Sequence, residues 1–177
     1  MVKKLLKFVA FFFFFIFALI LFAPKESFYY LLEQNLKKFD VIISNEKLEN
    51  KMLSLNIRNL DISVKGIKSL KIKKANIEIL GLYNAVELQN MQLSSLVENY
   101  LPAKINKVDI YYTILHPLQL KVNGYGKFGD ARVVVNILEK KATLILKPSK
   151  VMFSKYRNSL RTLKKSKNGE YTYEKSL

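Results

Sequence analysis

The sequence contains few residues that could carry acid–base, nucleophilic or metal chemistry. Its 177 residues include one histidine, His116, and no cysteine. These counts exclude a thiol nucleophile, a Cys-ligated metal centre and any site that needs two histidines. His116 precedes Pro117 between two strand-like runs, and no Gly-x-Ser-x-Gly elbow is present, so we interpret it as a loop residue. Asp109 and Asp130 could converge in space, although nothing in the sequence brings them together. We therefore expect a protein that is not an enzyme and uses no cofactor, metal or small-molecule substrate.

One glycine pattern, Gly124-x-Gly126-x-x-Gly129, matches the fingerprint of dinucleotide-binding loops. That fingerprint requires a preceding strand and a helix that opens at the third glycine. Here the third glycine is followed by Asp-Ala-Arg-Val-Val-Val, which is typical of a strand. We therefore interpret these glycines as a turn between two antiparallel strands.

The chain is strongly basic, with 30 Lys and Arg against 14 Asp and Glu and a formal net charge of +16. Only four cations are Arg, whereas phosphate and nucleic-acid sites favour the planar Arg fork. Compositional drift and solubility are thus one interpretation of the charge, and attraction to an anionic surface is the other. The basic C-terminal stretch is either a solvated helix face or a contact for lipid head groups or bases. Its candidate contacts are Arg157, Arg161, Lys164 and Lys165.

An apolar run of 16 residues, 8–23, follows three lysines near the N-terminus. With Leu5 and Leu6 it is long enough to cross a bilayer as a helix. A cleaved signal peptide is the alternative, but cleavage after Ala23 would place Leu21 at −3 and Pro24 at +1. We expect a retained single-pass anchor with a cytoplasmic N-terminus, because positive charge is concentrated before the span. The expected location is a bacterial inner membrane, with the rest of the chain in the periplasm. The expected anchor residues include Phe8, Phe11, Phe15, Leu19 and Ala23.

The elements after the anchor follow from the period of the apolar residues. Residues 25–39 have helical spacing and predict an amphipathic helix. Residues 40–149 alternate with period two and predict an antiparallel β-domain. The alternation slips by one residue after Ile57, so we expect a bulge or kink near Arg58–Asn59 that restores the original face. Similar slips follow in the next two strands.

Further elements are expected after residue 90. The spacing predicts a short helix ending at Pro102, a hairpin across residues 139–141, and a basic C-terminal helix and tail strand over residues 150–177. With residues 1–24 as cytoplasmic N-terminus and anchor, the fold class is mainly β (α+β). It comprises a transmembrane helix, then a curved antiparallel half-open sheet with short flanking helices.

A sheet with one apolar face must cover that face with a second layer, a partner or lipid. Because only three short helices are predicted, we expect part of the face to remain available. The residues predicted to line this groove or partner face are Leu53, Leu55, Ile57, Ile77, Ile79, Leu144 and Leu146.

The order of these parts resembles a known family. The chain begins with an anchor, a helix with residues 28–32, a short strand at 40–44 and the run 53–79 around Asn59-Leu60-Asp61. This order is similar to that in the N-terminal region of AsmA-like envelope proteins and type II secretion protein N. Residues 122–149 and the Gly-Glu-Tyr-Thr-Tyr ending are similar to the latter group. AsmA-like proteins are usually much longer. The resemblance implies a half-open, apolar-lined sheet that handles phospholipid or supports a secretion complex.

Three functional hypotheses remain open. The first is a non-enzymatic accessory component of an envelope machine such as type II secretion or related DNA uptake, with envelope proteins and inner-membrane phospholipid as partners. The second is an AsmA-like protein that binds or transfers phospholipid. The third and weakest is a basic membrane protein that binds nucleic acid through its C-terminal helix.

Overall fold

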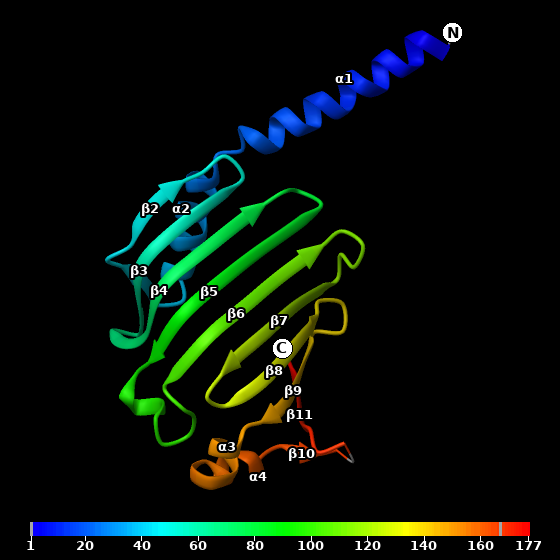
Figure 1. Cartoon of the computed structure of the whole chain (residues 1–177). Helices are drawn as coiled ribbons and strands as arrows, with labels where there is room; N and C mark the ends of the chain where they lie inside the picture. The colour runs from blue at the N-terminus through cyan, green and yellow to red at the C-terminus, as the bar shows by residue number, and fades with distance from the viewer. Residues whose placement is uncertain (1, 167) are drawn as a thin grey trace.

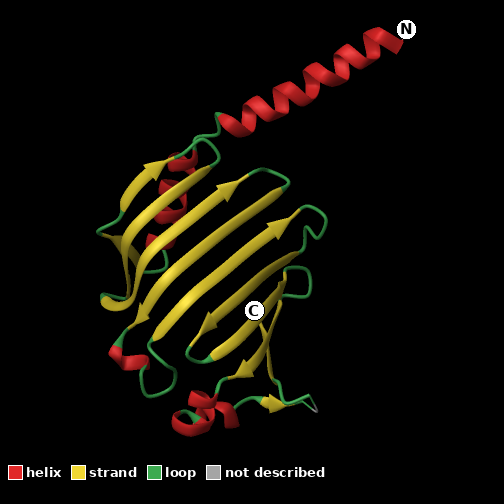
Figure 2. Ribbon diagram, viewed as in Figure 1, coloured by secondary structure: helices red, strands yellow, loops and turns green. Residues whose placement is uncertain are grey.

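The computed structural model describes residues 2–166 and 168–177. These residues form an N-terminal helix, one large antiparallel sheet and several short helices (Figure 1; Figure 2), which confirms the predicted fold class. The helices are α1 (Val2–Leu21), α2 (Lys25–Lys37), the 3-10 turn η1 (Ser95–Val97), α3 (Lys150–Lys155) and α4 (Arg157–Arg161). The strands are β1 (Val41–Ser44), β2 (Lys47–Asn50), β3 (Ser54–Val64), β4 (Ile67–Ile79), β5 (Tyr83–Leu93), β6 (Lys104–Thr113), β7 (Gln119–Gly126), β8 (Gly129–Asn136), β9 (Lys141–Pro148), β10 (Lys164–Lys165) and β11 (Tyr171–Ser176).

Seven strands, β3 to β9, form a meander in which each strand pairs with the next. At one edge, β1 and β2 pair with successive halves of β3. At the other edge, β11 returns to pair with β9, and the two-residue β10 lies outside it. The predicted hairpin is confirmed, since Val133 pairs with Leu144 and Val135 with Ala142. Because the connections between most strands are short, the sheet forms almost entirely from contacts between neighbours in sequence.

The strand register sorts the side chains into one apolar and one polar face. A row across eight strands is apolar, with tyrosine at its last position: Leu55, Ile77, Val86, Ile110, Val122, Val133, Leu144 and Tyr173. The neighbouring row on the opposite face contains Asn76, Glu87, Asp109, Asn123 and Arg132. Since side chains alternate between faces along a strand, this pattern divides the sheet into an apolar and a polar surface.

The sheet is curved, and its apolar face is concave. In Figure 1, β9 and β11 recede behind β7 and β8, so the sheet bends away from the viewer, and α2 lies on that same far side. Tyr29 of α2 belongs to the same buried cluster as Leu55 and Ile57 of β3, and Leu36 of α2 packs against this cluster. The face that α2 covers is therefore both the apolar face and the inside of the curve.

A line of irregular backbone crosses four strands and keeps the apolar residues on this inner face. β3 pairs with β4, β4 with β5, and β5 with β6, and in each pairing one residue of each strand has no partner while its neighbours are paired. These unpaired residues are Asn59, Lys73, Asn90 and Asn106. Asn59 and Asn90 have positive φ angles of 59° and 53°, in the left-handed region that Asn tolerates better than most residues. We name this line the Asn59–Asn106 kink.

The sequence around the kink repeats one pattern in each strand, two polar residues between two apolar ones. The four segments are Ile57-Arg-Asn-Leu60, Ile72-Lys-Lys-Ala75, Leu88-Gln-Asn-Met91 and Ile105-Asn-Lys-Val108. In a regular strand, residues three positions apart face opposite sides. Here all eight apolar residues contribute to one core cluster. This confirms the predicted kink near Arg58–Asn59 and the predicted slips in β4 and β5.

One core cluster covers the β3 side of the concave face, from Leu55 to Met91, and a second lies at the end farthest from α1. The first contains Tyr29 of α2 with Leu60, Ile72 and Met91 of β3, β4 and β5, all 5% exposed or less. The second packs Met152 of α3 and Leu160 of α4 against β9, at its other side. Half-buried Ile105 of β6 packs against both clusters and joins them. The predicted C-terminal helix is thus present as two short helices.

The glycine pattern is a turn between antiparallel strands, as predicted, because Gly126 of β7 pairs directly with Gly129 of β8. Its glycines make room for a buried aromatic ring. A Cβ on Gly126 would lie 2.9 Å from the Phe128 ring, and Gly129 has a φ of 111° with no space for a Cβ beside the Lys147 carbonyl. Phe128 is 5% exposed and belongs to the second core cluster. The glycines thus serve packing.

The kink predicts a specific effect on stability. Replacing Asn59 with Val places a β-branched residue in the left-handed region and should lower the free energy of unfolding by about 1–2 kcal/mol. Asn59→Gly removes that strain and should unfold close to wild type. Asn56→Val, in the same strand but with an ordinary φ, is the control. Thermal unfolding in detergent compares the three; an Asn59→Val variant as stable as Asn56→Val would contradict a strained kink at this position.

Candidate functional site

The polar, convex face carries a cluster of charged side chains that is the first candidate for chemistry. Lys107 Nζ lies 2.9 Å from Glu87 Oε2 and 3.1 Å from Asp109 Oδ1. Gln89 donates a further hydrogen bond to Glu87. Hydrogen bonding to Lys107 and Gln89 lowers the pKa of the Glu87 carboxyl, and hydrogen bonding to Glu87 and Asp109 raises the pKa of Lys107. Both shifts favour the charged forms, as in a structural ion pair and unlike a general acid or base.

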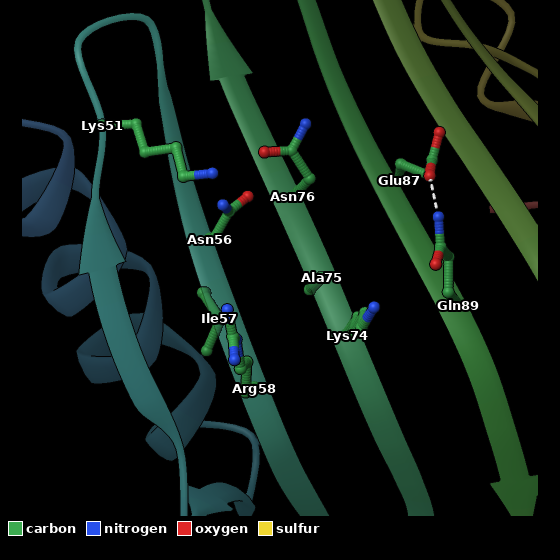
Figure 3. A pocket seen from close by; sticks show the side chains of 9 residues that line it. All are labelled: Lys51, Asn56, Ile57, Arg58, Lys74, Ala75, Asn76, Glu87 and Gln89. Carbon is green, nitrogen blue, oxygen red and sulfur yellow. Dashed lines mark hydrogen bonds between the residues drawn. The ribbon is translucent and has the colours of Figure 1, made fainter.

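Shallow polar hollows lie beside this cluster on the convex face. Figure 3 shows Asn56, Asn76, Lys74 and the hydrogen-bonded Glu87–Gln89 pair on neighbouring strands, with α2 behind the sheet. Among the described residues, no group of three or more His, Asp or Glu side chains is arranged to hold a metal ion. The convex face is therefore a solvated surface on which neighbouring strands exchange ion pairs and amide hydrogen bonds.

Of the two aspartates singled out from sequence, Asp109 joins the Lys107 cluster and Asp130 is exposed at the start of β8. His116 is exposed in the turn between β6 and β7, as expected for a loop residue. These positions give no nucleophile–base pair. They leave the concave face as the second candidate.

The concave face is partly open between the two core clusters. Met91 and Leu146, at the end of the sheet far from α1, are buried. Nearer α1, the inward side chains of five successive strands are only half-buried: Val86, Ile110, Val122, Val133 and Leu144. We name these five residues the open apolar row. α2 packs against β1, β2 and β3, and α3 packs against β9. One helix therefore contacts the sheet at each flank of this row.

The residues predicted to line a groove fall into three places. Leu55, Ile57 and Leu146 are buried in the two core clusters beneath helices. Ile77, Ile79 and Leu144 are half-buried at the inner face. Leu53 lies in the turn between β2 and β3 and is exposed.

Four members of the open apolar row were not singled out from sequence. Val86, Ile110, Val122 and Val133 each alternate with polar residues, so the signal for an inward position was present. The alternation does not show which inward residues a helix covers. The covered residues depend on where α2 and α3 pack, and the local sequence pattern does not determine those positions.

The helix α1 is long and apolar enough to span a membrane. None of its residues is buried against the rest of the protein. At about 1.5 Å per residue, 20 residues extend about 30 Å, the thickness of a bilayer core. Of the predicted anchor residues, Phe8, Phe11, Phe15 and Leu19 lie in α1 and are exposed, and Ala23 follows its end.

An apolar hollow lies where α1 meets the sheet. Its walls are Ile16, Leu19, Ile20 and Ala23, with Phe28 of α2 and residues 79–82 at the end of β4 and in the next turn. Beside it, Lys25 is buried and its Nζ donates to the carbonyl oxygens of Leu21 and Ala23, each at 3.4 Å. A cation at the C-terminal carbonyls of a helix is electrostatically favourable. Lys25 thereby ties the end of α1 to the start of α2.

The predicted anionic-surface residues are exposed but distant from α1. Arg157 and Arg161 lie on α4, and Lys164 and Lys165 form β10 instead of continuing a helix. In Figure 1, α4 and β10 lie at the end of the sheet opposite α1. These cations therefore face away from any bilayer that α1 enters.

No family model, curated protein or solved structure matches this chain.

The Glu87 ion pair gives a testable pH dependence. Because the folded-state pKa of Glu87 lies below its usual 4.5, the pair stabilises the fold above that pH and loses its contribution as the pH falls through the folded pKa. Glu87→Gln should therefore lower the melting temperature slightly at pH 7, and the deficit should be smaller at pH 3. Glu98→Gln, in the exposed connection between β5 and β6, is the control. A deficit of equal size at both pH values would contradict the ion pair.

Proposed function

We propose that this protein is a non-enzymatic, membrane-anchored binding protein whose concave face takes up phospholipid acyl chains. The observation that carries the proposal is the open apolar row, half-buried on the inside of a curved sheet whose far end is closed. An apolar surface on this scale requires a cover, and the residues described leave it open on the side toward α1.

Acyl chains suit this face by chemistry and by position. The row consists of five aliphatic side chains and runs across five adjacent strands. Each methylene transferred from water to such a surface contributes about 0.8 kcal/mol. A lipid already in a bilayer gains little from the move, so the face would exchange lipid with a membrane more readily than it would trap it.

The topology that we propose follows from charge. Lys3, Lys4 and Lys7 precede the apolar span, so the N-terminus lies in the cytoplasm and the sheet lies beyond a bacterial inner membrane, in the periplasm. In this arrangement, α1 holds the open side of the sheet at the outer leaflet. The resemblance to AsmA-like proteins supports the same proposal through the order of the parts.

An accessory role in type II secretion or DNA uptake is an alternative hypothesis. It invokes a partner strand that pairs with a free sheet edge. The strands at the edges are short, four residues each in β1 and β2 and two in β10, so they offer a partner strand little backbone. We therefore favour lipid binding over an envelope-protein partner recruited in this way.

Two adjacent valines of β8 provide a matched test of lipid binding. Val133 faces inward beside Val122 and Leu144, and Val134 lies on the convex face; both are half-buried. Val133→Asp places a carboxylate where an acyl chain would pack, at a high desolvation cost. Native mass spectrometry after mild extraction should show phospholipid on the wild type and on Val134→Asp but not on Val133→Asp. Wild-type protein without lipid, or equal lipid on both variants, would refute the proposal.

A further inference from the structure

The turns at the α1 end of the sheet are unusually apolar. Four turns lie there, between β2 and β3, β4 and β5, β6 and β7, and β8 and β9 (Figure 1). Each exposes a large apolar side chain: Met52 is 73% exposed, Leu82 65%, Leu115 80% and Leu138 71%. We name these four residues the apolar rim. Isolated exposed apolar residues are common on protein surfaces. Here all four turns at the α1 end of the sheet have one, so together they form a row of exposed apolar side chains.

The tight turns at the opposite end have different chemistry. The turn between β3 and β4 is Lys65-Gly66. In the turn between β7 and β8, Lys127 is exposed and Phe128 is folded into the core. The large apolar residues exposed at this end lie outside the tight turns, for example Leu96 and Tyr100 in the longer connection between β5 and β6 and Phe39 between α2 and β1. The tips of the tight turns therefore differ between the two ends, which indicates different surroundings for these tips.

The position of the turn between β4 and β5 identifies the surroundings of the rim. Residues 79–82 share an apolar hollow with Ile16, Leu19 and Ile20 of α1. Ile16 lies five residues before the end of α1, or about 7.5 Å along the helix axis. If α1 crosses a bilayer to its last residue, this turn lies at the depth of the outermost acyl carbons. Apolar faces of interfacial segments enter bilayers to about 5–10 Å.

We infer that the apolar rim rests in the surface of the lipid bilayer that α1 crosses, so that the open side of the concave face meets the membrane directly. This inference depends on the part of the proposed function that places α1 in a bilayer, and not on lipid in the concave face. The rim adds contacts with the bilayer along the whole α1 end of the sheet, beyond the single place where α1 meets the β4–β5 turn. Lys51 and Lys140, beside two of the rim turns, suit the level of anionic head groups.

The absence of tryptophan from the chain allows a direct test. Single variants Leu115→Trp, Leu138→Trp, Leu96→Trp and Leu19→Trp of the full chain are placed in liposomes of phosphatidylcholine and phosphatidylglycerol. Part of the lipid carries bromine near the head group or deep in the acyl chain, because bromine quenches tryptophan on contact. The rim variants should lose most of their fluorescence to shallow bromine, and Leu96→Trp should keep nearly all of it.

The Leu19→Trp variant separates the two possible failures. Quenching at Leu19 together with none at Leu115 and Leu138 would overturn the rim while leaving α1 in the bilayer. Absence of quenching at Leu19 as well would show that α1 does not enter the bilayer, and the proposed function would fail with the rim. Equal quenching at Leu96 and Leu115 would mean that the sheet lies flat on the lipid, which also contradicts the rim.

Discussion

The structure depends on the need of a single sheet to cover its apolar face. Each strand from β3 to β9 places aliphatic side chains on the inner side, yet the helices that pack against it among the described residues, α2, α3 and α4, lie at its two flanks. Burial of these side chains holds the helices in place and closes the end of the sheet far from α1. Between the flanks, the open apolar row remains half-exposed. The uncovered part therefore follows from the same interaction that builds the core, and it is the part for which we propose lipid.

The closure of the concave face depends on the Asn59–Asn106 kink. Without it, Ile57 and Leu60 would face opposite sides, and half of the inward residues of four strands would be turned to water. Asn59 and Asn90, in the left-handed region, allow one residue of each strand to be left out of the pairing. The unpaired residues of β3, β4, β5 and β6 lie opposite one another. The kink ends at β7, where the pairing of β6 shifts between Ile105 and Lys107. Ile105, at this boundary, joins the two core clusters, so local backbone geometry and the global core are linked there.

Local pattern was sufficient to predict the apolar helix, the alternating strands, the kink near Asn59, the hairpin after Val135 and the glycine turn, because each depends on residues close in sequence. It was not sufficient where distant elements decide. Leu55 and Ile57 alternate like Val122 and Val133, but α2 buries the first pair and leaves the second pair half-exposed. Lys164 and Lys165 directly follow the helical spacing that ends at Leu163, and only pairing with the distant β11 makes them a strand. The apolar rim could not be predicted from the sequence either, because the sequence does not show that the turns with these exposed residues lie at the same end of the sheet.

Since the chain has no cysteine, single spin labels can report on each face of one strand. The nitroxides are attached to Val122→Cys and Asn123→Cys, two neighbouring positions on opposite faces of β7. In lipid nanodiscs, the accessibility of each label is measured by its collisions with oxygen, which concentrates in lipid, and with a water-soluble nickel chelate. A lipid-filled concave face predicts high oxygen and low nickel accessibility at position 122, and the reverse at position 123. A label at position 122 that nickel reaches freely, or that neither reagent reaches, would contradict the account, because water or protein would then occupy the face.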